Sequence, residues 1–192
     1  MTNKTGLYLL LAAGFSQRFG SPKLLHALPS GRSIIQASIK ALKSSGCTFA
    51  LVIREGDTAL TAHLSNTNVS VIKVSSAEKG LSSVIAEATA SINTKSVDWI
   101  GICLADMPYI LPQTFTSLPN HISLSTIVRP CYQKKLGHPV LFGRYYFDEL
   151  SQLSGDDGAK SILKQFPNAL NIINVDDPMI LHDIDVPQNV LS

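Results

Sequence analysis

The sequence predicts an α/β fold, a layer sandwich built on one mostly parallel sheet. Apolar runs rich in β-branched residues alternate with stretches of helical periodicity, which is the pattern of βαβ units. Runs 7–13 and 99–105 are apolar almost throughout, as expected of central strands covered on both faces. The length of 192 residues suits one core, and no repeat or linker divides it, so residues 1–192 are expected to form a single domain.

The elements follow in chain order. Seven short apolar runs predict strands, at 7–13, 48–54, 69–74, 99–105, 125–130, 139–143 and 169–175. Apolar residues at helical spacing between these runs predict helices at 33–45, 57–65, 82–93, 112–118, 144–153 and 157–166. Only eight residues separate 125–130 from 139–143, which favours a hairpin or an antiparallel edge there.

Composition excludes several classes of protein. Hydrophobic residues make up 45% of the chain and charged residues 16%, which is typical of globular proteins and not of disordered ones. The net charge of +2 comes from scattered Lys and Arg without a basic block, so no nucleic-acid partner is expected.

Location is predicted from the cysteines and the apolar segments. Cys47, Cys103 and Cys131 are odd in number and far apart, which favours buried free thiols in a reducing compartment. No apolar stretch approaches the roughly 20 residues of a membrane helix. Lys4 and the run after it superficially resemble a short signal peptide, but the loop that follows is better explained as a binding site. The protein is therefore expected in the cytoplasm, without a membrane partner.

Open α/β sheets bind ligands at the carboxyl ends of their strands. That rule selects the segments after Ala13, Val74 and Ala105. The segment after Ala13 has neither of the two common phosphate-binding motifs, because both the Walker A spacing and the dinucleotide fingerprint Gly-x-Gly-x-x-Gly are missing.

The first loop nevertheless carries groups that bind polyphosphate. Gly14 and Gly20 permit close backbone approach, Ser16 adds a hydroxyl, and Arg18 and Lys23 add cationic donors. No acidic residue lies between positions 6 and 54, so the cationic side chains of Arg18 and Lys23 are expected to face an external anion. The alternative is a solvated turn.

The stretch LAAGFSQRFGSPK (11–23) resembles the signature L-A-A/G-G-x-S-x-R-x-G-x-x-K of the MobA-like nucleotidyltransferases, especially the molybdenum cofactor cytidylyltransferases. The resemblance implies catalytic roles for Arg18 and Lys23. It also implies nucleotide contacts along the whole motif, at Leu11, Ala12, Ala13, Gly14, Ser16, Arg18 and Lys23.

Asp106 lies at the carboxyl end of the predicted strand 99–105, within the second strong motif, GICLADMPYI (101–110). A polyphosphate requires Mg²⁺, which proteins hold through one or two carboxylates plus substrate oxygens. LADMP also resembles the family segment whose aspartate binds the metal, which makes Asp106 a catalytic and metal-binding candidate. The alternative is a turn-forming or helix-capping aspartate.

Weaker matches follow. EKGLSSVIAEA (78–88) resembles the family's Gly-Met-Ser-Ser-Ser segment, which implies nucleotide contacts at Gly80, Ser82 and Ser83, although Leu81 and Val84 depart from that pattern. Plain capping of a helix is the alternative.

LGHPVLF (136–142) and LSGDDGAKSIL (153–163) resemble family segments near the second substrate, which implies substrate contacts at His138 and Asp156. The alternatives are a histidine at the start of a strand, and a helix cap formed by Asp156 or Asp157.

HDIDVPQNV (182–190) resembles the family's Asp-Ile-Asp-Thr-Pro-Glu-Asp-Leu segment. Asp183 and Asp185 are therefore candidates for the second metal ligand, and Asp185 is preferred. The alternative is a solvated acidic turn.

The resemblance implies a Rossmann-like three-layer α/β/α sandwich of the nucleotide-diphospho-sugar transferase type. It also implies Mg²⁺-dependent transfer of a nucleotidyl group from an NTP to the phosphate of molybdopterin cofactor, with a molybdoenzyme as a candidate recipient of the product. Ala12 and Ala13 resemble the CTP-using members, so CTP is favoured. Two alternatives stay open, namely transfer to another phosphorylated small molecule and a non-catalytic accessory protein that binds nucleotide or cofactor.

Overall fold

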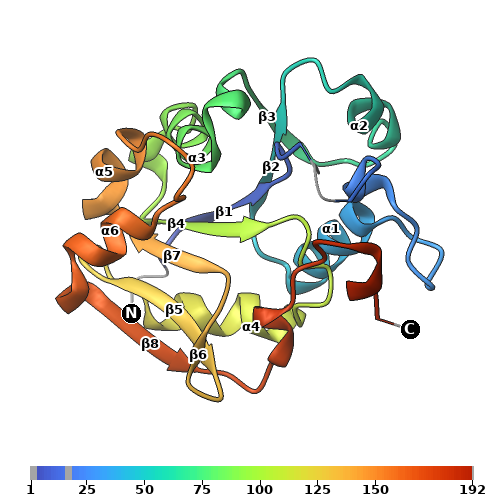
Figure 1. The fold of residues 1–192 in the computed structure, drawn as a ribbon. Helices are drawn as coiled ribbons and strands as arrows, with labels where there is room; N and C mark the ends of the chain where they lie inside the picture. The colour runs from blue at the N-terminus through green and yellow to red at the C-terminus, as the bar shows by residue number, and fades with distance from the viewer. Residues whose placement is uncertain (1–3, 16–18, 192) are drawn as a thin grey trace.

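The computed structural model describes residues 4–15 and 19–191. One mixed sheet runs through the molecule in the order β3-β2-β1-β4-β7-β5-β6, with β8 paired to the free side of β5 (Figure 1). The strands are β1 (Gly6–Leu11), β2 (Phe49–Arg54), β3 (Ser70–Val74), β4 (Trp99–Leu104), β5 (Ile127–Tyr132), β6 (Lys135–Leu136), β7 (Val140–Gly143) and β8 (Leu170–Asn174). The helices are α1 (Ile34–Ser45), α2 (Thr58–His63), α3 (Leu81–Ala90), α4 (Pro112–Ser117), α5 (Phe147–Ser151) and α6 (Lys160–Gln165).

The predicted strands and helices are all present, most of them with shorter bounds, whereas β5 keeps its predicted length but lies two residues later than the predicted 125–130. Strands β3, β2, β1 and β4 are parallel, and β8 is parallel to β5. Strand β7 is antiparallel to both β4 and β5, which confirms the antiparallel pairing expected for these closely spaced runs. Strand β6 was not predicted, because its two residues, Lys135 and Leu136, are exposed and carry no alternating pattern.

Side chains of β1 alternate between two cores, which explains why this strand is apolar on both faces. Tyr8 and Leu10 pack on one face with residues of α1 and α4, whereas Leu9 and Leu11 pack on the other with residues of α3, α5 and α6. These two helical layers enclose the sheet (Figure 1) and make the predicted three-layer sandwich. Strands β1 and β4 lie side by side at its centre, so their carboxyl ends meet at one edge.

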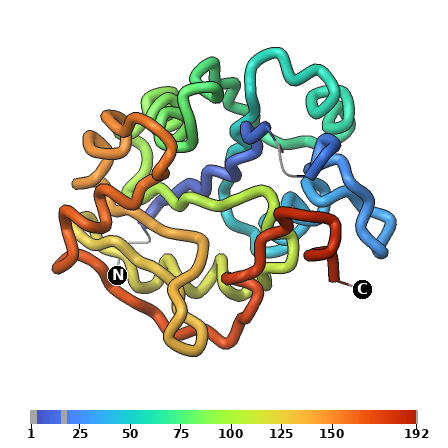
Figure 2. Tube along the Cα trace, viewed as in Figure 1, coloured from blue at the N-terminus to red at the C-terminus, as the bar shows by residue number. Residues whose placement is uncertain are grey.

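The C-terminal segment returns to that edge. It passes beside the chain that follows β1 (Figure 2), where buried Ile184 packs in a small cluster with Phe19, Leu28 and Ile34. The Ile184 N–H donates to the Asp106 carbonyl at 2.9 Å. This docking brings the acidic turn at 183–185 against the end of β4.

The cysteines are free thiols, with Cys103 and Cys131 buried and Cys47 only half-buried. Cys47 departs from the predicted burial because it lies beyond the end of α1, where its thiol reaches the Phe115 carbonyl at 3.6 Å. In the described part of the chain, no helix is long and apolar enough to cross a bilayer.

Candidate functional site

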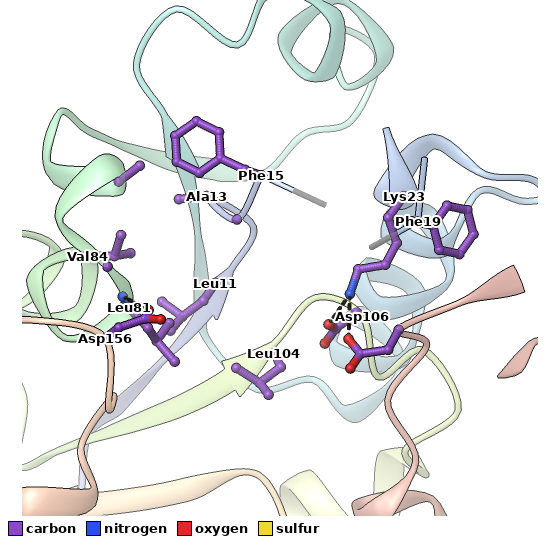
Figure 3. A pocket seen from close by; sticks show the side chains of 14 residues that line it. Leu11, Ala13, Phe15, Phe19, Lys23, Leu81, Val84, Leu104, Asp106 and Asp156 are labelled. Carbon is purple, nitrogen blue, oxygen red and sulfur yellow. Dashed lines mark hydrogen bonds and ion pairs between the residues drawn. The ribbon is translucent and has the colours of Figure 1, made fainter. Parts of the chain in front are cut away.

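The carboxyl ends of β1 and β4 open into a cavity of about 400 Å³ (Figure 3). The first loop, the start of α3, the turn after β4 and the C-terminal segment all contribute to its wall. Eight predicted site residues line it, namely Leu11, Ala13, Gly14, Lys23, Gly80, Asp106, Asp156 and Asp185.

One lysine and two carboxylates form the polar end of this first cavity. The Lys23 Nζ lies 2.7 Å from Asp106 Oδ2 and 3.4 Å from Asp185 Oδ1 (Figure 3). The Lys23 side chain is only 12% exposed, so it is held in place and not free in solvent. The Asp185 N–H in turn donates to the Asn189 side-chain oxygen at 3.2 Å, which fixes the acidic turn.

The cationic side chains of the first loop were expected to have no carboxylate partner within the protein, and this expectation is wrong for Lys23. No carboxylate is close in sequence, but the fold brings Asp106 from 83 residues away and Asp185 from 162 residues away. Lys23 therefore works within an acidic cluster, and an incoming anion meets a net negative group.

The environment of Asp106 opposes its charge. Burial raises the pKa of the Asp106 carboxyl above its ordinary value, although the ammonium of Lys23 acts in the opposite direction. Its second oxygen, Oδ1, is buried and makes no hydrogen bond with the described residues. An unpartnered carboxylate oxygen in a buried position is costly unless a ligand satisfies it.

These oxygens fit a hard divalent cation. Asp106 and Asp185 each place one oxygen beside the same ammonium, so both carboxylates lie at one end of the first cavity. Among the described residues, no group of three or more His, Cys, Asp or Glu is placed to hold a metal ion. Two carboxylates without a full protein cage suit Mg²⁺, which keeps several waters and takes further oxygens from a phosphate substrate.

The opposite end of the first cavity is the N-terminus of α3. Gly80 occupies its N-cap with a φ of 99° and has no side chain to cap the helix. The Asp156 carboxylate does so instead, accepting a hydrogen bond from the Leu81 N–H at 3.0 Å (Figure 3). Asp156 thus caps α3 and not the helix that follows it in sequence, and its carboxylate faces the cavity.

Replacing Gly80 with alanine is expected to lower the free energy of unfolding by about 2–3 kcal/mol, because its φ suits only glycine. The added Cβ would also lie 2.5 Å from the Gly155 carbonyl oxygen. Urea denaturation followed by circular dichroism measures the loss. Gly14→Ala is the matched control, since a Cβ at Gly14 meets nothing within 4 Å. Equal urea midpoints for Gly80→Ala and wild type would contradict the requirement for glycine at position 80.

The two serines after Gly80 do not line the first cavity. Ser82 is 1% exposed, and its hydroxyl donates to the Gly158 carbonyl at 3.0 Å, because the loop carrying Asp156 packs against it. The Ser83 hydroxyl donates to the Lys79 carbonyl one turn earlier at 3.3 Å. Both serine hydroxyls thus donate within the protein, and their contacts with a nucleotide stay a prediction.

Other predicted residues are placed as follows. Ala12 lies in the α1-side core, and its N–H donates to the Val52 carbonyl at 2.8 Å, so its amide is already used. Ser16 and Arg18 lie outside the described residues. His138 lines a separate cavity, which shares Leu81 and Leu104 with the first.

His138 is neutral at physiological pH. Burial, together with the nearby Arg129 guanidinium, lowers the pKa of its imidazole to about 4. It is therefore a hydrogen-bonding group rather than a cation.

The sequence argument missed the apolar part of the first cavity, formed by Phe15, Phe19, Leu81, Val84 and Leu104. Two phenylalanines within a glycine-containing loop were the sequence signal for this apolar wall, because large apolar side chains are unfavourable in a turn that is exposed to solvent. Leu81 and Val84, which depart from the family's pattern, supply apolar wall in place of polar contacts.

Comparison with known proteins identifies the family to which this chain belongs. A family model described as the MobA-like NTP transferase domain matches residues 8–170. Purine catabolism protein PucB of Bacillus subtilis (strain 168) is 27% identical over 194 aligned residues, covering 94% of this chain and 91% of that protein. Nicotine blue oxidoreductase of Paenarthrobacter nicotinovorans is 26% identical, covering 95% of this chain and 93% of that protein.

Solved structures show the same fold. The crystal structure of Rv0371c from Mycobacterium tuberculosis H37Rv superposes with a TM-score of 0.85 at 25% identity, covering 98% of this chain and 96% of that one.

Proposed function

Because the chain belongs to the MobA-like NTP transferase family, we propose that this nucleotidyltransferase moves CMP from CTP to the phosphate of a molybdopterin-type cofactor and releases pyrophosphate. The cluster of Lys23, Asp106 and Asp185 carries this proposal. It sets a cationic donor and two metal-type ligands at the carboxyl ends of adjacent central strands, where open α/β sheets bind ligands.

The reaction demands alignment and charge neutralisation rather than covalent chemistry by the protein. An oxygen of the acceptor phosphate attacks the α-phosphorus of CTP, and the bond from that phosphorus to the bridging oxygen of pyrophosphate breaks. No general base is required, since the attacking phosphate is already ionised. Lys23 donates to phosphate oxygens that gain charge as pyrophosphate departs.

Asp106 and Asp185 would hold Mg²⁺, which supplies positive charge to the phosphates in the transition state. Without it, one ammonium faces two carboxylates, and the resulting negative charge repels a triphosphate. The cluster therefore makes nucleotide binding depend on a divalent cation.

The choice of CTP is supported by the wall of the first cavity. Ala13 lines that cavity and is itself 3% exposed, so its Cβ is fixed in the wall. A methyl group there narrows the space for a base and favours a pyrimidine.

The relative from Paenarthrobacter is an oxidoreductase by name. This chain lacks the dinucleotide fingerprint Gly-x-Gly-x-x-Gly after β1, so an oxidoreductase that uses a dinucleotide is not proposed.

CTP with Mg²⁺ is expected to raise the melting temperature, whereas CTP without Mg²⁺ is not. Binding at 100 times Kd stabilises the native state by about 2.7 kcal/mol, or roughly 5–10 °C for a chain of this length. Thermal shift assays with CTP, GTP, ATP and UTP, each with Mg²⁺ or EDTA, measure this.

A response to GTP and none to CTP would overturn the choice of base. Pyrophosphate release with molybdopterin, and then with sugar or alcohol phosphates, tests the acceptor. Binding of CTP without turnover of any acceptor would favour an accessory protein that presents the cofactor to a molybdoenzyme.

A further inference from the structure

A groove of about 500 Å³ lies along α1 and shares no lining residue with the first cavity. Its polar wall is formed by Arg32, Gln36, Lys40 and Lys43, and we call it the basic groove. Thr67, in the segment between α2 and β3, also lines it. Three of these five side chains are cationic and none is acidic, so the basic groove differs in charge from the acidic cluster of the first cavity.

Helical spacing gathers these residues from positions that are not consecutive. Arg32 directly precedes Ser33, the N-cap of α1, and Lys43 lies in the last turn of that helix. Steps of four, four and three residues connect Arg32, Gln36, Lys40 and Lys43, and residues at such steps lie on one side of a helix. The basic side of α1 is therefore formed without a run of consecutive Lys and Arg.

The three cations of the basic groove have no counterion in the described part of the chain. Arg32, Lys40 and Lys43 are exposed, and none of them pairs with a described carboxylate. Lys40 and Lys43 lie three residues apart on the helix, where like charges repel each other. Arg32 lies at the N-terminal end of α1, where the helix dipole disfavours a cation. An anion bound in the groove would relieve both unfavourable interactions.

The length of the basic groove indicates what kind of anion it suits. Arg32 and Lys43 are eleven positions apart, which corresponds to about 16 Å along a helix axis. A single phosphate or carboxylate group cannot contact both ends, whereas about five residues of an extended peptide span this distance. No aromatic side chain among the described residues lines the groove, so the bases of a single-stranded nucleic acid would have nothing to stack on.

We infer that the basic groove is a docking surface for an extended acidic segment of a partner protein. Carboxylates of that segment pair with Arg32, Lys40 and Lys43, and its backbone lies along α1. The inference does not rest on the proposed function, because the groove and the first cavity have no lining residue in common.

The test uses a fluorescein-labelled peptide of six glutamates, whose fluorescence anisotropy reports binding. The wild type is expected to bind it at low ionic strength and more weakly at physiological ionic strength, because the charges are exposed. A triple variant, Arg32→Gln with Lys40→Gln and Lys43→Gln, is expected to bind about 10-fold more weakly, since exposed ion pairs are individually weak and three of them are lost.

A second triple variant is the matched control. Lys95→Gln, Lys134→Gln and Lys164→Gln remove the same amount of charge from exposed positions outside the basic groove. This variant is expected to bind the peptide within about twofold of the wild type, because attraction to a distant exposed charge is screened by salt. Thermal shifts with Mg-CTP are expected to be the same in the wild type and in both triple variants.

The inference is overturned if the wild type does not bind the glutamate peptide, or if both triple variants lose the same affinity for it. Displacement of the peptide by inorganic phosphate at equal affinity would show a site for a single anion and would also overturn it. Tighter binding of an oligothymidylate than of the peptide, lost in the groove variant, would assign the groove to nucleic acid instead. Loss of the Mg-CTP response in the wild type would count against the transferase and leave the docking surface unaffected.

Discussion

Asp106→Asn is expected to lower turnover by roughly 10²–10³-fold, the loss typical of a group that stabilises transition-state charge, without lowering stability. The substitution keeps the shape of the side chain but removes the negative charge that would hold Mg²⁺. Pyrophosphate release under saturating CTP and acceptor measures the rate.

Stability is expected to stay level or rise in this variant, for an electrostatic reason. The pKa of the Asp106 carboxyl is raised by burial, so the folded protein holds that proton more tightly than the unfolded chain does. An acid with a raised folded-state pKa reduces stability when ionised, and the loss is relieved as the pH falls through that pKa. A neutral amide avoids this cost, and Lys23 keeps Asp185 as a partner.

Asp183→Asn is the control for Asp106→Asn. Asp183 is exposed and lies on the same acidic turn, but Lys23 pairs with Asp185 and not with Asp183. We expect turnover within a few-fold of wild type for Asp183→Asn. Wild-type turnover in a folded Asp106→Asn protein would remove Asp106 from the mechanism.

Asp177→Ala is expected to destabilise the chain by about 3–5 kcal/mol, because it leaves three hydrogen-bond donors without an acceptor. Asp177 is 1% exposed and lies in the segment after β8. Its Oδ2 accepts from the Leu111 N–H at 2.9 Å and the Thr114 hydroxyl at 2.6 Å, while its Oδ1 accepts from the Met179 N–H at 3.0 Å. The melting temperature should fall by roughly 10 °C.

Asp176→Ala is the matched control, since Asp176 is the same residue type one position earlier and is exposed. It should melt within a degree or two of wild type. If both variants melt alike, the buried carboxylate does not anchor the C-terminal segment to α4.

The central sheet and the position of the site were predictable because local signals determine them. The apolar runs around β1 and β4 identify two central parallel strands, and their carboxyl ends must then share an edge. That argument places Lys23 and Asp106 on one side of the molecule, where the structure has them 2.7 Å apart. The contact itself was not predictable, because it depends on how the first loop closes.

The contacts that the sequence did not reveal join residues that are distant in the chain. Ser82 looked available for a ligand, but its hydroxyl bonds a carbonyl 76 residues later. Asp156 caps a helix 75 residues earlier, so no local capping pattern revealed it. Arg129 read as an ordinary strand residue, and only the pairing of β5 with β7 sets it in a cavity beside His138.

The docking of Ile184 has a consequence for protein synthesis and turnover. The sheet can be complete at Asn174, but the second carboxylate of the charge cluster, Asp185, is synthesised after the last strand. A nascent chain that has not yet reached Asp185, or a molecule cut by a protease between β8 and Asp185, would retain its strands and yet lack one of the two groups expected to hold the metal.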